Sequence, residues 1–413
     1  MKTSFLVAGL FISAVLLQAC SSTSQTVRIP TPLTDGVETR AMSLQWQVSV
    51  DKLAEADGRS LALTSDGQRL YVASSSGLLT ALWKQNQSRY TDQVIWQTNY
   101  EAAVIAGPVL ADEKLLVGSA KGDVLALSPD NGQVIWQARL NSEVISTPVV
   151  EGHRVFVRTN DGRVVALNVS TGEVIWVADH QMPSLFIRGA APVLVEGDKV
   201  YVGRESGFVE ALSINTGETI WDARIATPSG RTDLERMVDI QSSLVLHNGR
   251  LIVLSYNGRM AALNPNNGNI SWAKDISGYR DFTVIDNVIY LVDEEDILRA
   301  LDPVTGTEFW NQAALKYRLL GDVRVDLNNP TSKPAIFLSD GLGYLHWLDP
   351  KDGHIMARYK HANHLKDGET ILQIHQDKQH YYVLDSDGGV TAYQHRSAPT
   401  TRPGGVNSSV NHE

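Results

Sequence analysis

The chain has 413 residues, of which 43% are hydrophobic and 20% are charged, and its formal net charge is −10. This acidic balance argues against non-specific binding of DNA or RNA, so we expect no nucleic-acid partner. The length suits two or three ordinary domains or one large repeat fold.

The first residues resemble an export signal. Lys2 precedes an uncharged apolar run, Phe5 to Leu17, which is too short for a comfortable transmembrane helix and suits a signal-peptide core. The following Leu-Gln-Ala-Cys resembles the bacterial lipobox, and its Cys20 is the only cysteine of the chain. We therefore expect residues 1–19 to be a signal peptide and Cys20 to carry a lipid. An ordinary signal peptide with a chance cysteine is the alternative.

The residue after the cysteine suggests a destination. Ser21, not aspartate, follows Cys20, which resembles the pattern of lipoproteins sent to the outer membrane of Gram-negative bacteria. We expect a lipid-anchored protein that faces the periplasm, attached to the membrane through its anchor only. Residues 20–40 are rich in Ser, Thr and Pro and predict a flexible tether, and residues 397–413 predict a disordered tail.

Two short motifs repeat between these ends. A turn glycine followed by three variable residues and Ala-Leu recurs eight times, as GDVLAL from Gly122 and in weaker forms such as GGVTAY from Gly388. A second motif, typified by TGEVIW, ends in tryptophan. The tryptophans are Trp46, Trp96, Trp136, Trp176, Trp221, Trp272 and Trp310, and the eighth equivalent position is Ala357. Spacings of this size are typical of propeller blades or helical repeats.

The pattern within one unit favours propeller blades. Four short runs rich in Val and Ile are separated by EG, NDG and STG, which are hairpin signals. We therefore predict an all-β, eight-bladed propeller over residues 41–396, built from four-stranded antiparallel blades. The first unit begins at the strand of Trp46 and the last lacks a fourth strand. The amino-terminal strand should therefore complete the last blade and close the ring. Each tryptophan should fill the gap to the next blade.

The repeats resemble a known class of proteins. Ala-Leu…Gly-x-x-x-Trp units are similar to those of the quinoprotein alcohol dehydrogenase propellers. With a lipobox in front, the chain resembles the lipoprotein B subunits of the outer-membrane β-barrel assembly machinery. Two loops carry this closer match. MPSLFIRG, residues 182–189, resembles the family's MPSL-x-(Leu/Ile)-R-G loop, and RTDLERMVDIQ, residues 231–241, resembles another family segment.

The resemblance implies a non-catalytic scaffold without a cofactor. Such a scaffold would bind the POTRA domains of the barrel-forming subunit and aid insertion of β-barrel proteins into the outer membrane. Whether unfolded clients also bind stays open. The alternative is a small periplasmic dehydrogenase that depends on pyrroloquinoline quinone (PQQ) and Ca²⁺.

Candidate metal ligands are weak. Asp293 to Asp296 form an acidic run without the alternating spacing of a calcium loop, and we expect an exposed hairpin turn there. His361 and His364 have no carboxylate or cysteine at a matching spacing, and we expect a solvated loop. We therefore predict no metal site and no catalytic residue.

Two insertions should lie on one rim. WKQNQSRYTD, residues 83–92, and ATPSGRTDLERMVDIQ, residues 226–241, are both expected to connect an outer strand to the next inner strand. The loop MPSLFIRG should lie near the second insertion. We predict that Leu185, Ile187 and Arg188, with Asp239, form the partner-binding surface. In the alternative interpretation, Leu185 and Ile187 tuck into the blade and Arg188 is solvated.

Overall fold

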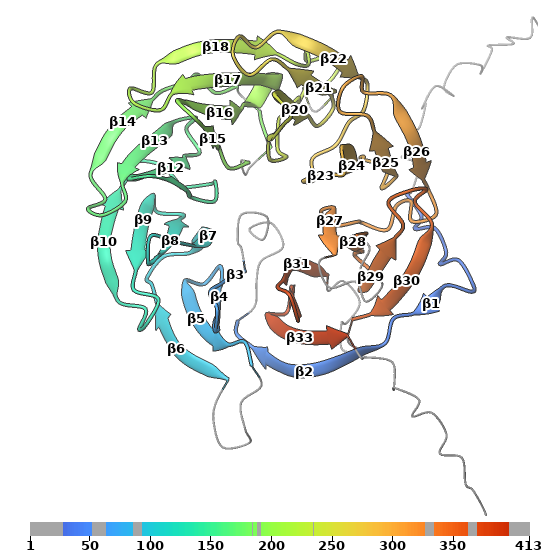
Figure 1. Ribbon diagram of the computed structural model, residues 1–413. Helices are drawn as coiled ribbons and strands as arrows, with labels where there is room; N and C mark the ends of the chain where they lie inside the picture. The colour runs from blue at the N-terminus through green and yellow to red at the C-terminus, as the bar shows by residue number, and fades with distance from the viewer. Residues whose placement is uncertain are drawn as a thin grey trace, which may run out of the picture.

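The computed structural model describes residues 28–51, 63–85, 93–183, 185–187, 191–233, 235–326, 334–361 and 370–395. These ranges form eight sheets arranged in a ring (Figure 1). The prediction of an eight-bladed all-β propeller is therefore confirmed. Within the same ranges, no helix has the length and apolarity needed to cross a membrane.

The first four blades follow the chain from the inner to the outer strand. Blade 1 contains β3 (Thr64–Ser65), β4 (Arg69–Ala73), β5 (Leu78–Trp83) and β6 (Val94–Asn99). Blade 2 contains β7 (Val104–Ala111), β8 (Lys114–Ser119), β9 (Asp123–Leu127) and β10 (Val134–Arg139). Blade 3 contains β11 (Val149–Glu151), β12 (Arg154–Arg158), β13 (Val164–Asn168) and β14 (Val174–Ala178). Blade 4 contains β15 (Leu194–Glu196), β16 (Lys199–Gly203), the 3-10 turn η1 (Glu205–Gly207), β17 (Phe208–Ser213) and β18 (Thr219–Arg224).

The last four blades use the same order until the ring closes. Blade 5 contains β19 (Val245–His247), β20 (Arg250–Leu254), β21 (Met260–Leu263) and β22 (Ile270–Lys274). Blade 6 contains β23 (Thr283–Ile285), β24 (Val288–Val292), β25 (Leu298–Leu301) and β26 (Glu308–Gln312). Blade 7 contains β27 (Arg324–Asp326), β28 (Ala335–Ser339), β29 (Tyr344–Leu348), β30 (Ile355–Lys360) and β1 (Glu38–Thr39). Blade 8 contains β31 (Ile371–Gln376), β32 (Tyr381–Asp385), β33 (Gly389–His395) and β2 (Met42–Ser49).

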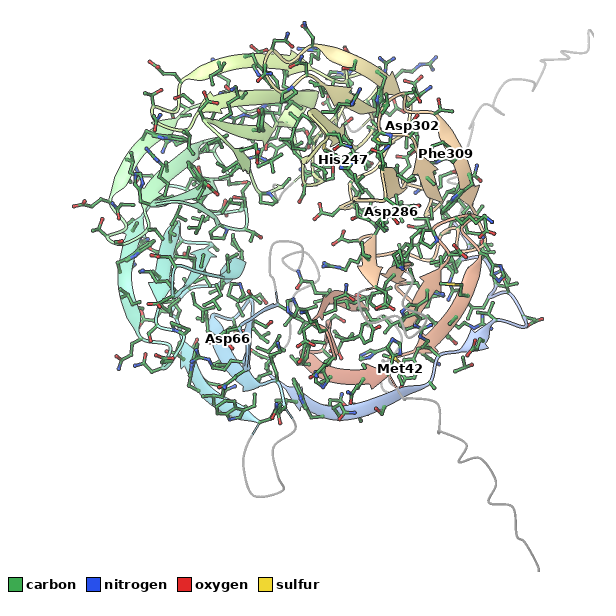
Figure 2. The ribbon with its side chains drawn as sticks, in the orientation of Figure 1. Met42, Asp66, His247, Asp286, Asp302 and Phe309 are labelled. Atoms are coloured by element: carbon green, nitrogen blue, oxygen red, sulfur yellow. The ribbon has the colours of Figure 1, made fainter. Side chains whose placement is uncertain are left out.

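Burial along the strands explains the stacking of the blades. The middle strands, such as β9, are buried at every position because both faces of the sheet lie against neighbouring blades. The outer strands are buried only in part, so that β10 buries Trp136 and Ala138 and exposes Val134, Ile135, Gln137 and Arg139. Phe309 on β26 is one such exposed residue and lies at the circumference (Figure 2).

The amino-terminal strand closes the ring as predicted. β2 is the outer strand of blade 8 and pairs antiparallel with β33, with Trp46 opposite Ala392. Blade 7 differs from the prediction because it has a fifth strand. The two residues of β1 pair parallel with the outer edge of β30, since the chain runs along this edge on its way to β2.

The described part of the expected tether is packed against the propeller. Between residues 28 and 40, the backbone N–H of Thr31 donates to the carbonyl of Lys316 at 3.0 Å, and Arg318 Nη1 donates to the Thr31 carbonyl at 2.9 Å. Leu33 and Val37 pack against the core between blades 6 and 7. Residues 28–40 therefore contact the propeller at blades 6 and 7. Residues 1–27, with Cys20, and the expected tail 397–413 lie outside the described residues.

The tryptophans join neighbouring blades, as predicted. Each of the seven indole Nε1–H groups donates to a backbone carbonyl in the next blade, at 2.9 to 3.2 Å. Each tryptophan also faces an alanine of the adjacent third strand, as Trp136 faces Ala126. In blade 7 the same pair has exchanged strands, because Trp347 of β29 faces Ala357 of β30. This exchange explains why the eighth equivalent position is alanine.

One predicted connection is wrong. Residues 84–93 join β5 to the outer strand β6 within blade 1, and do not lead from an outer strand to the next inner strand. Successive turns of an antiparallel meander alternate between the two rims, so this turn and the insertion after β18 lie on opposite rims. Residues 86–92 of the turn lie outside the described ranges.

Candidate partner-binding site

The predicted site combines two connections on the same rim. One connection joins β14 to β15 and carries Met182–Ile187, and the other joins β18 to β19 and carries Val238–Gln241. The Gln241 side-chain Nε2 donates to the Ile187 carbonyl at 3.3 Å. The expectation that these connections from blades 3 and 4 lie side by side is therefore confirmed.

Asp239 links the first connection to the turn between β16 and β17. Its carboxylate accepts the backbone N–H of Ile187 at 2.6 Å and the backbone N–H of Ser206 at 3.3 Å. The side chain is buried, and burial raises the pKa of Asp239 above its usual range although both hydrogen bonds lower it. Asp239 belongs to the predicted partner-binding surface. Its carboxylate is buried and already bonded to two backbone N–H groups, so within that surface it positions the connection that carries Ile187.

The two apolar residues have different environments. Leu185 is 46% exposed, whereas Ile187 is half-buried. Leu185 is thus exposed, whereas Ile187, whose N–H donates to Asp239, is neither fully exposed nor fully buried. Arg188 lies outside the described residues, so its predicted role stays a prediction.

Polar contacts also hold the connection from β14 to β15 near its two ends. Arg158 of β12 pairs with Glu205 of η1 at 2.8 Å, and its Nη1 donates to the Ala191 carbonyl at 3.4 Å. His180 Nε2 donates to Glu210 at 2.7 Å. Burial by itself would raise the Glu210 pKa, but the hydrogen bonds from His180 and Thr219 and the charge of Arg204 lower it to about 2. The connection is thus fixed near both ends and at Ile187.

The second connection has a local turn of its own. The Glu235 carboxylate accepts the backbone N–H groups of Arg231 at 2.6 Å and Thr232 at 3.1 Å. The Thr232 hydroxyl in turn accepts the Glu235 N–H at 3.2 Å, which is the reciprocal pattern of a capping box. This turn holds a charged, exposed segment of the second connection, and the Glu235 carbonyl accepts Asn257 Nδ2 of blade 5 at 3.4 Å.

Sequence reasoning missed Arg158 and Glu205. The turn between β16 and β17 reads Arg204-Glu205-Ser206-Gly207, where the corresponding turn of blade 3 reads Asn160-Asp161-Gly162. The available signal was a pair of charged residues, Arg204 and Glu205, at positions where blade 3 has Thr159 and Asn160. The sequence does not show that Glu205 pairs with Arg158, because Arg158 lies in another blade.

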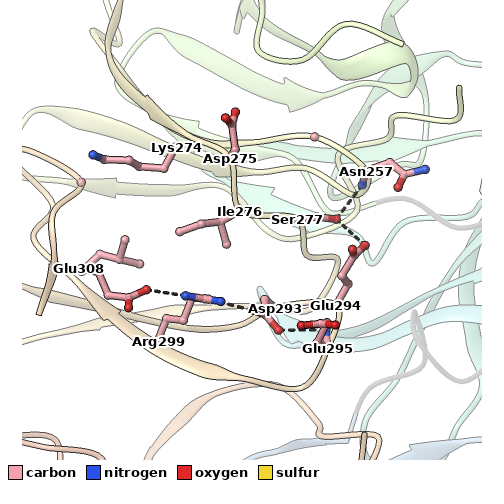
Figure 3. A pocket seen from close by; sticks show the side chains of 13 residues that line it. Asn257, Lys274, Asp275, Ile276, Ser277, Asp293, Glu294, Glu295, Arg299 and Glu308 are labelled. Atoms are coloured by element: carbon pink, nitrogen blue, oxygen red, sulfur yellow. Dashed lines mark hydrogen bonds and ion pairs between the residues drawn. The ribbon is translucent and has the colours of Figure 1, made fainter. Parts of the chain in front are cut away.

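The acidic run forms a turn but is not exposed. Asp293 and Asp296 are buried at the turn between β24 and β25, so the expectation of an exposed turn is wrong for these two residues. Asp293 Oδ2 accepts Arg299 Nε at 2.8 Å, and Arg299 Nη1 donates to Glu308 at 2.6 Å (Figure 3). These contacts lie in a cleft of about 570 Å³ between blades 5 and 6. Among the described residues, no group of three or more His, Cys, Asp or Glu has a geometry suited to a metal ion.

His361 is also buried, so the expectation of a solvated loop is wrong there. Its Nδ1 lies 2.9 Å from the Tyr393 hydroxyl, and its Nε2 lies 3.7 Å from Asp385. The burial arises because β30 ends against blade 8. His364 lies outside the described residues.

Comparisons with known proteins agree with the architecture and the sequence motifs. A family model described as outer membrane protein assembly factor BamB matches residues 85–312. A relative of that name from Pseudomonas aeruginosa is 37% identical over 361 residues, which cover 85% of this chain and 90% of the relative. Another from Moranella endobia is 35% identical over 155 residues, which cover 36% of this chain and 38% of that protein.

A solved structure shares the fold. The crystal structure of BamB from Moraxella catarrhalis superposes with a TM-score of 0.73 at 22% identity. The superposition covers 86% of this chain and 99% of that one. The closed ring of blades is thus common to both chains.

Proposed function

Because the chain belongs to the BamB family of outer membrane protein assembly factors, we propose that it is a lipid-anchored scaffold that docks a barrel-forming subunit through the POTRA domains of that subunit. Cys20 carries the anchor, and the propeller faces the periplasm of a Gram-negative cell. The same membership favours an assembly factor over the alternative, a dehydrogenase dependent on PQQ.

One observation carries the docking proposal. Leu185 is exposed on a connection that Asp239, Gln241 and Arg158 fix at several points. An exposed apolar side chain close to such fixed points can bury area against a partner with a reduced ordering cost on binding. Arg188 follows three residues after Leu185 in the chain and supplies a forked donor for a carboxylate or a carbonyl.

The test compares two equally exposed apolar residues. Leu185→Ala should reduce co-purification with the barrel-forming subunit by at least about tenfold, because central apolar contacts typically contribute about 2 kcal/mol or more. The matched control is Ile220→Ala on β18, since both side chains are 46% exposed and Ile220 lies on the circumference. Quantitative pull-down from solubilised membranes measures the effect.

Folding must be measured in the same samples. Both variants should unfold at the wild-type temperature, because neither side chain belongs to the buried core. Full recovery of the partner with a folded Leu185→Ala variant would place the docking surface elsewhere. Equal loss with Ile220→Ala would mean that the partner binds the circumference.

A further inference from the structure

A second apolar patch lies where the amino-terminal segment meets the propeller. Ile29 is 72% exposed, Leu319 is 59% exposed and Leu342 is 47% exposed. Leu319 lies against Gly341, because a Cβ added to Gly341 would come within 2.7 Å of the Leu319 Cβ. We call these three residues, with Arg28, Lys316 and Tyr317, the amino-terminal patch.

Hydrogen bonds join the parts of this patch. The Thr31 N–H and the Thr31 hydroxyl both donate to the Lys316 carbonyl at 3.0 Å. Arg28 Nη1 donates to the Glu294 carbonyl at 3.0 Å, and the Arg28 guanidinium lies 5.6 Å from the Tyr317 ring centre. The first described residues of the chain therefore lie across the connection between β26 and β27.

This connection presents Leu319 on a fixed backbone. The Asp296 carboxylate accepts the N–H groups of Leu319 at 2.7 Å and Leu320 at 3.2 Å, and it pairs with Arg280 at 3.1 Å. A buried aspartate thus holds the Leu319 loop as Asp239 holds the Leu185 loop. Tyr317 and Leu319 have φ values of 59° and 58°, in the left-handed region that residues other than glycine rarely adopt. The backbone of Leu319 is therefore held by these contacts in a position that leaves its side chain exposed.

The short stretch of chain between Cys20 and Arg28 limits how far this patch can lie from the lipid anchor. Seven residues, Ser21 to Val27, separate Cys20 from Arg28. A fully extended chain spans at most ~3.6 Å per residue, so Cys20 lies within roughly 29 Å of Arg28. If Cys20 carries the lipid, this patch is the described surface closest along the chain to the bilayer.

We propose that the amino-terminal patch contacts the surface of the bilayer in which the Cys20 lipid is inserted; this inference rests on the lipid anchor of the proposed function. Ile29, Leu319 and Leu342 enter the boundary between headgroups and acyl chains, and Arg28 donates to lipid phosphates. Lys316 contributes less charge, because it pairs with Glu295 at 3.0 Å. The patch alone binds weakly, and the anchor raises its effective concentration at the membrane.

The experiment uses the single cysteine of the chain. Lipidation consumes Cys20, so Leu319→Cys introduces the only free thiol of the mature protein. The lipidated variant, labelled there with a polarity-sensitive fluorophore, is inserted into vesicles of phosphatidylethanolamine and phosphatidylglycerol that contain a headgroup-labelled quencher lipid. Controls carry the fluorophore at Leu185→Cys, on the same rim, and at Phe309→Cys, at the circumference.

The expected result is at least about twofold stronger quenching at position 319 than at positions 185 and 309. Equal or weaker quenching at 319, in protein that floats with the vesicles, would overturn the bilayer contact and leave the anchor intact. Protein that does not float would refute the anchor, and the bilayer contact with it. Quenching at 319 that the barrel-forming subunit removes without changing flotation would also overturn the proposal, because the patch would then be a protein contact.

Discussion

Six turn glycines each meet the tryptophan of the preceding blade. An added Cβ would lie 2.5 to 2.7 Å from a ring carbon, and the φ values lie between 68° and 76°. The positions are Gly132, Gly172, Gly217, Gly268, Gly306 and Gly353. Each glycine therefore meets two requirements, a left-handed backbone and space for an indole ring.

Alanine substitutions at two glycines, Gly217 and Gly197, can distinguish the need for a left-handed backbone from the need for space beside the indole ring. Gly217→Ala places a methyl group against Trp176, whereas Gly197, with φ of 61°, has no atom within 4 Å of the added Cβ. Both variants carry the left-handed cost of about 1 kcal/mol, and Gly217→Ala should lose a further ~1–3 kcal/mol through overpacking. Urea denaturation measures the free energy of unfolding. Equal losses would mean that the ring contact is not what requires glycine.

β2 is the strand that closes the ring of blades. It pairs with β33 from Met42 to Ser49, and the Trp46 Nε1–H donates to the Lys84 carbonyl of blade 1 at 2.9 Å. One strand thus belongs to blade 8 by its backbone and contacts blade 1 through a side chain. Without it, β33 would expose an unpaired edge.

Two residues of β2 test this closure. Trp46→Ala should lower the free energy of unfolding by ~3–5 kcal/mol, because it opens a cavity between the first and last blades. Leu44→Ala, on the same strand but exposed, should change it by no more than about 0.5 kcal/mol. Thermal and urea unfolding compare the two variants with the wild type. A Trp46→Ala variant as stable as Leu44→Ala would mean that closure does not depend on this contact.

At the scale of the whole molecule, polar contacts link blades 5, 6 and 7 beside their inner strands. The Asp281 carboxylate accepts the Ser243 N–H at 2.6 Å, and the Asp281 N–H donates to the Asp322 carboxylate at 3.0 Å. Each of these residues lies two positions before an inner strand. Burial and the nearby Asp322 charge raise the pKa of Asp281 to about 6.

This raised pKa predicts a pH dependence of stability. The folded protein binds a proton at Asp281 more tightly than the unfolded chain, whose pKa is near 3.8. The stabilising contribution is therefore complete below that value and is lost as the pH rises through about 6. Asp281→Asn should remove this loss, so the variant should gain stability relative to the wild type between about pH 4.5 and about pH 7.5.

The matched control is Asp286→Asn, an exposed turn residue of the same blade that removes the same charge. The urea midpoint of Asp281→Asn relative to that of the wild type should rise from about pH 4.5 to about pH 7.5, and that of Asp286→Asn should not. A stability difference between wild type and Asp281→Asn that does not change with pH would contradict the assignment.

Local patterns determine most of the architecture. The alternation of apolar residues, the hairpin turns and the tryptophan spacing are all visible within single units, so the number of blades and the closing strand follow from residues close in the chain. The rim position of MPSLFIRG and its contact with the next insertion could also be predicted, since connections of one kind fall on one rim. The prediction for residues 83–92 is wrong because a long turn interrupts the repeat between β5 and β6.

Only the tertiary structure decides the details of the surfaces. The carboxylate of Asp239 accepts the Ile187 N–H across 52 positions in the chain, and the exposed Leu185 lies two residues before this contact. Asp296 likewise determines how Leu319 is presented, and packing against blades 6 and 7 orders residues 28–40. These connections have no periodicity, so their shapes come from long-range contacts and not from local preference. A repeat can specify its own strands, but its side-chain environments exist only once the neighbouring blades are in place.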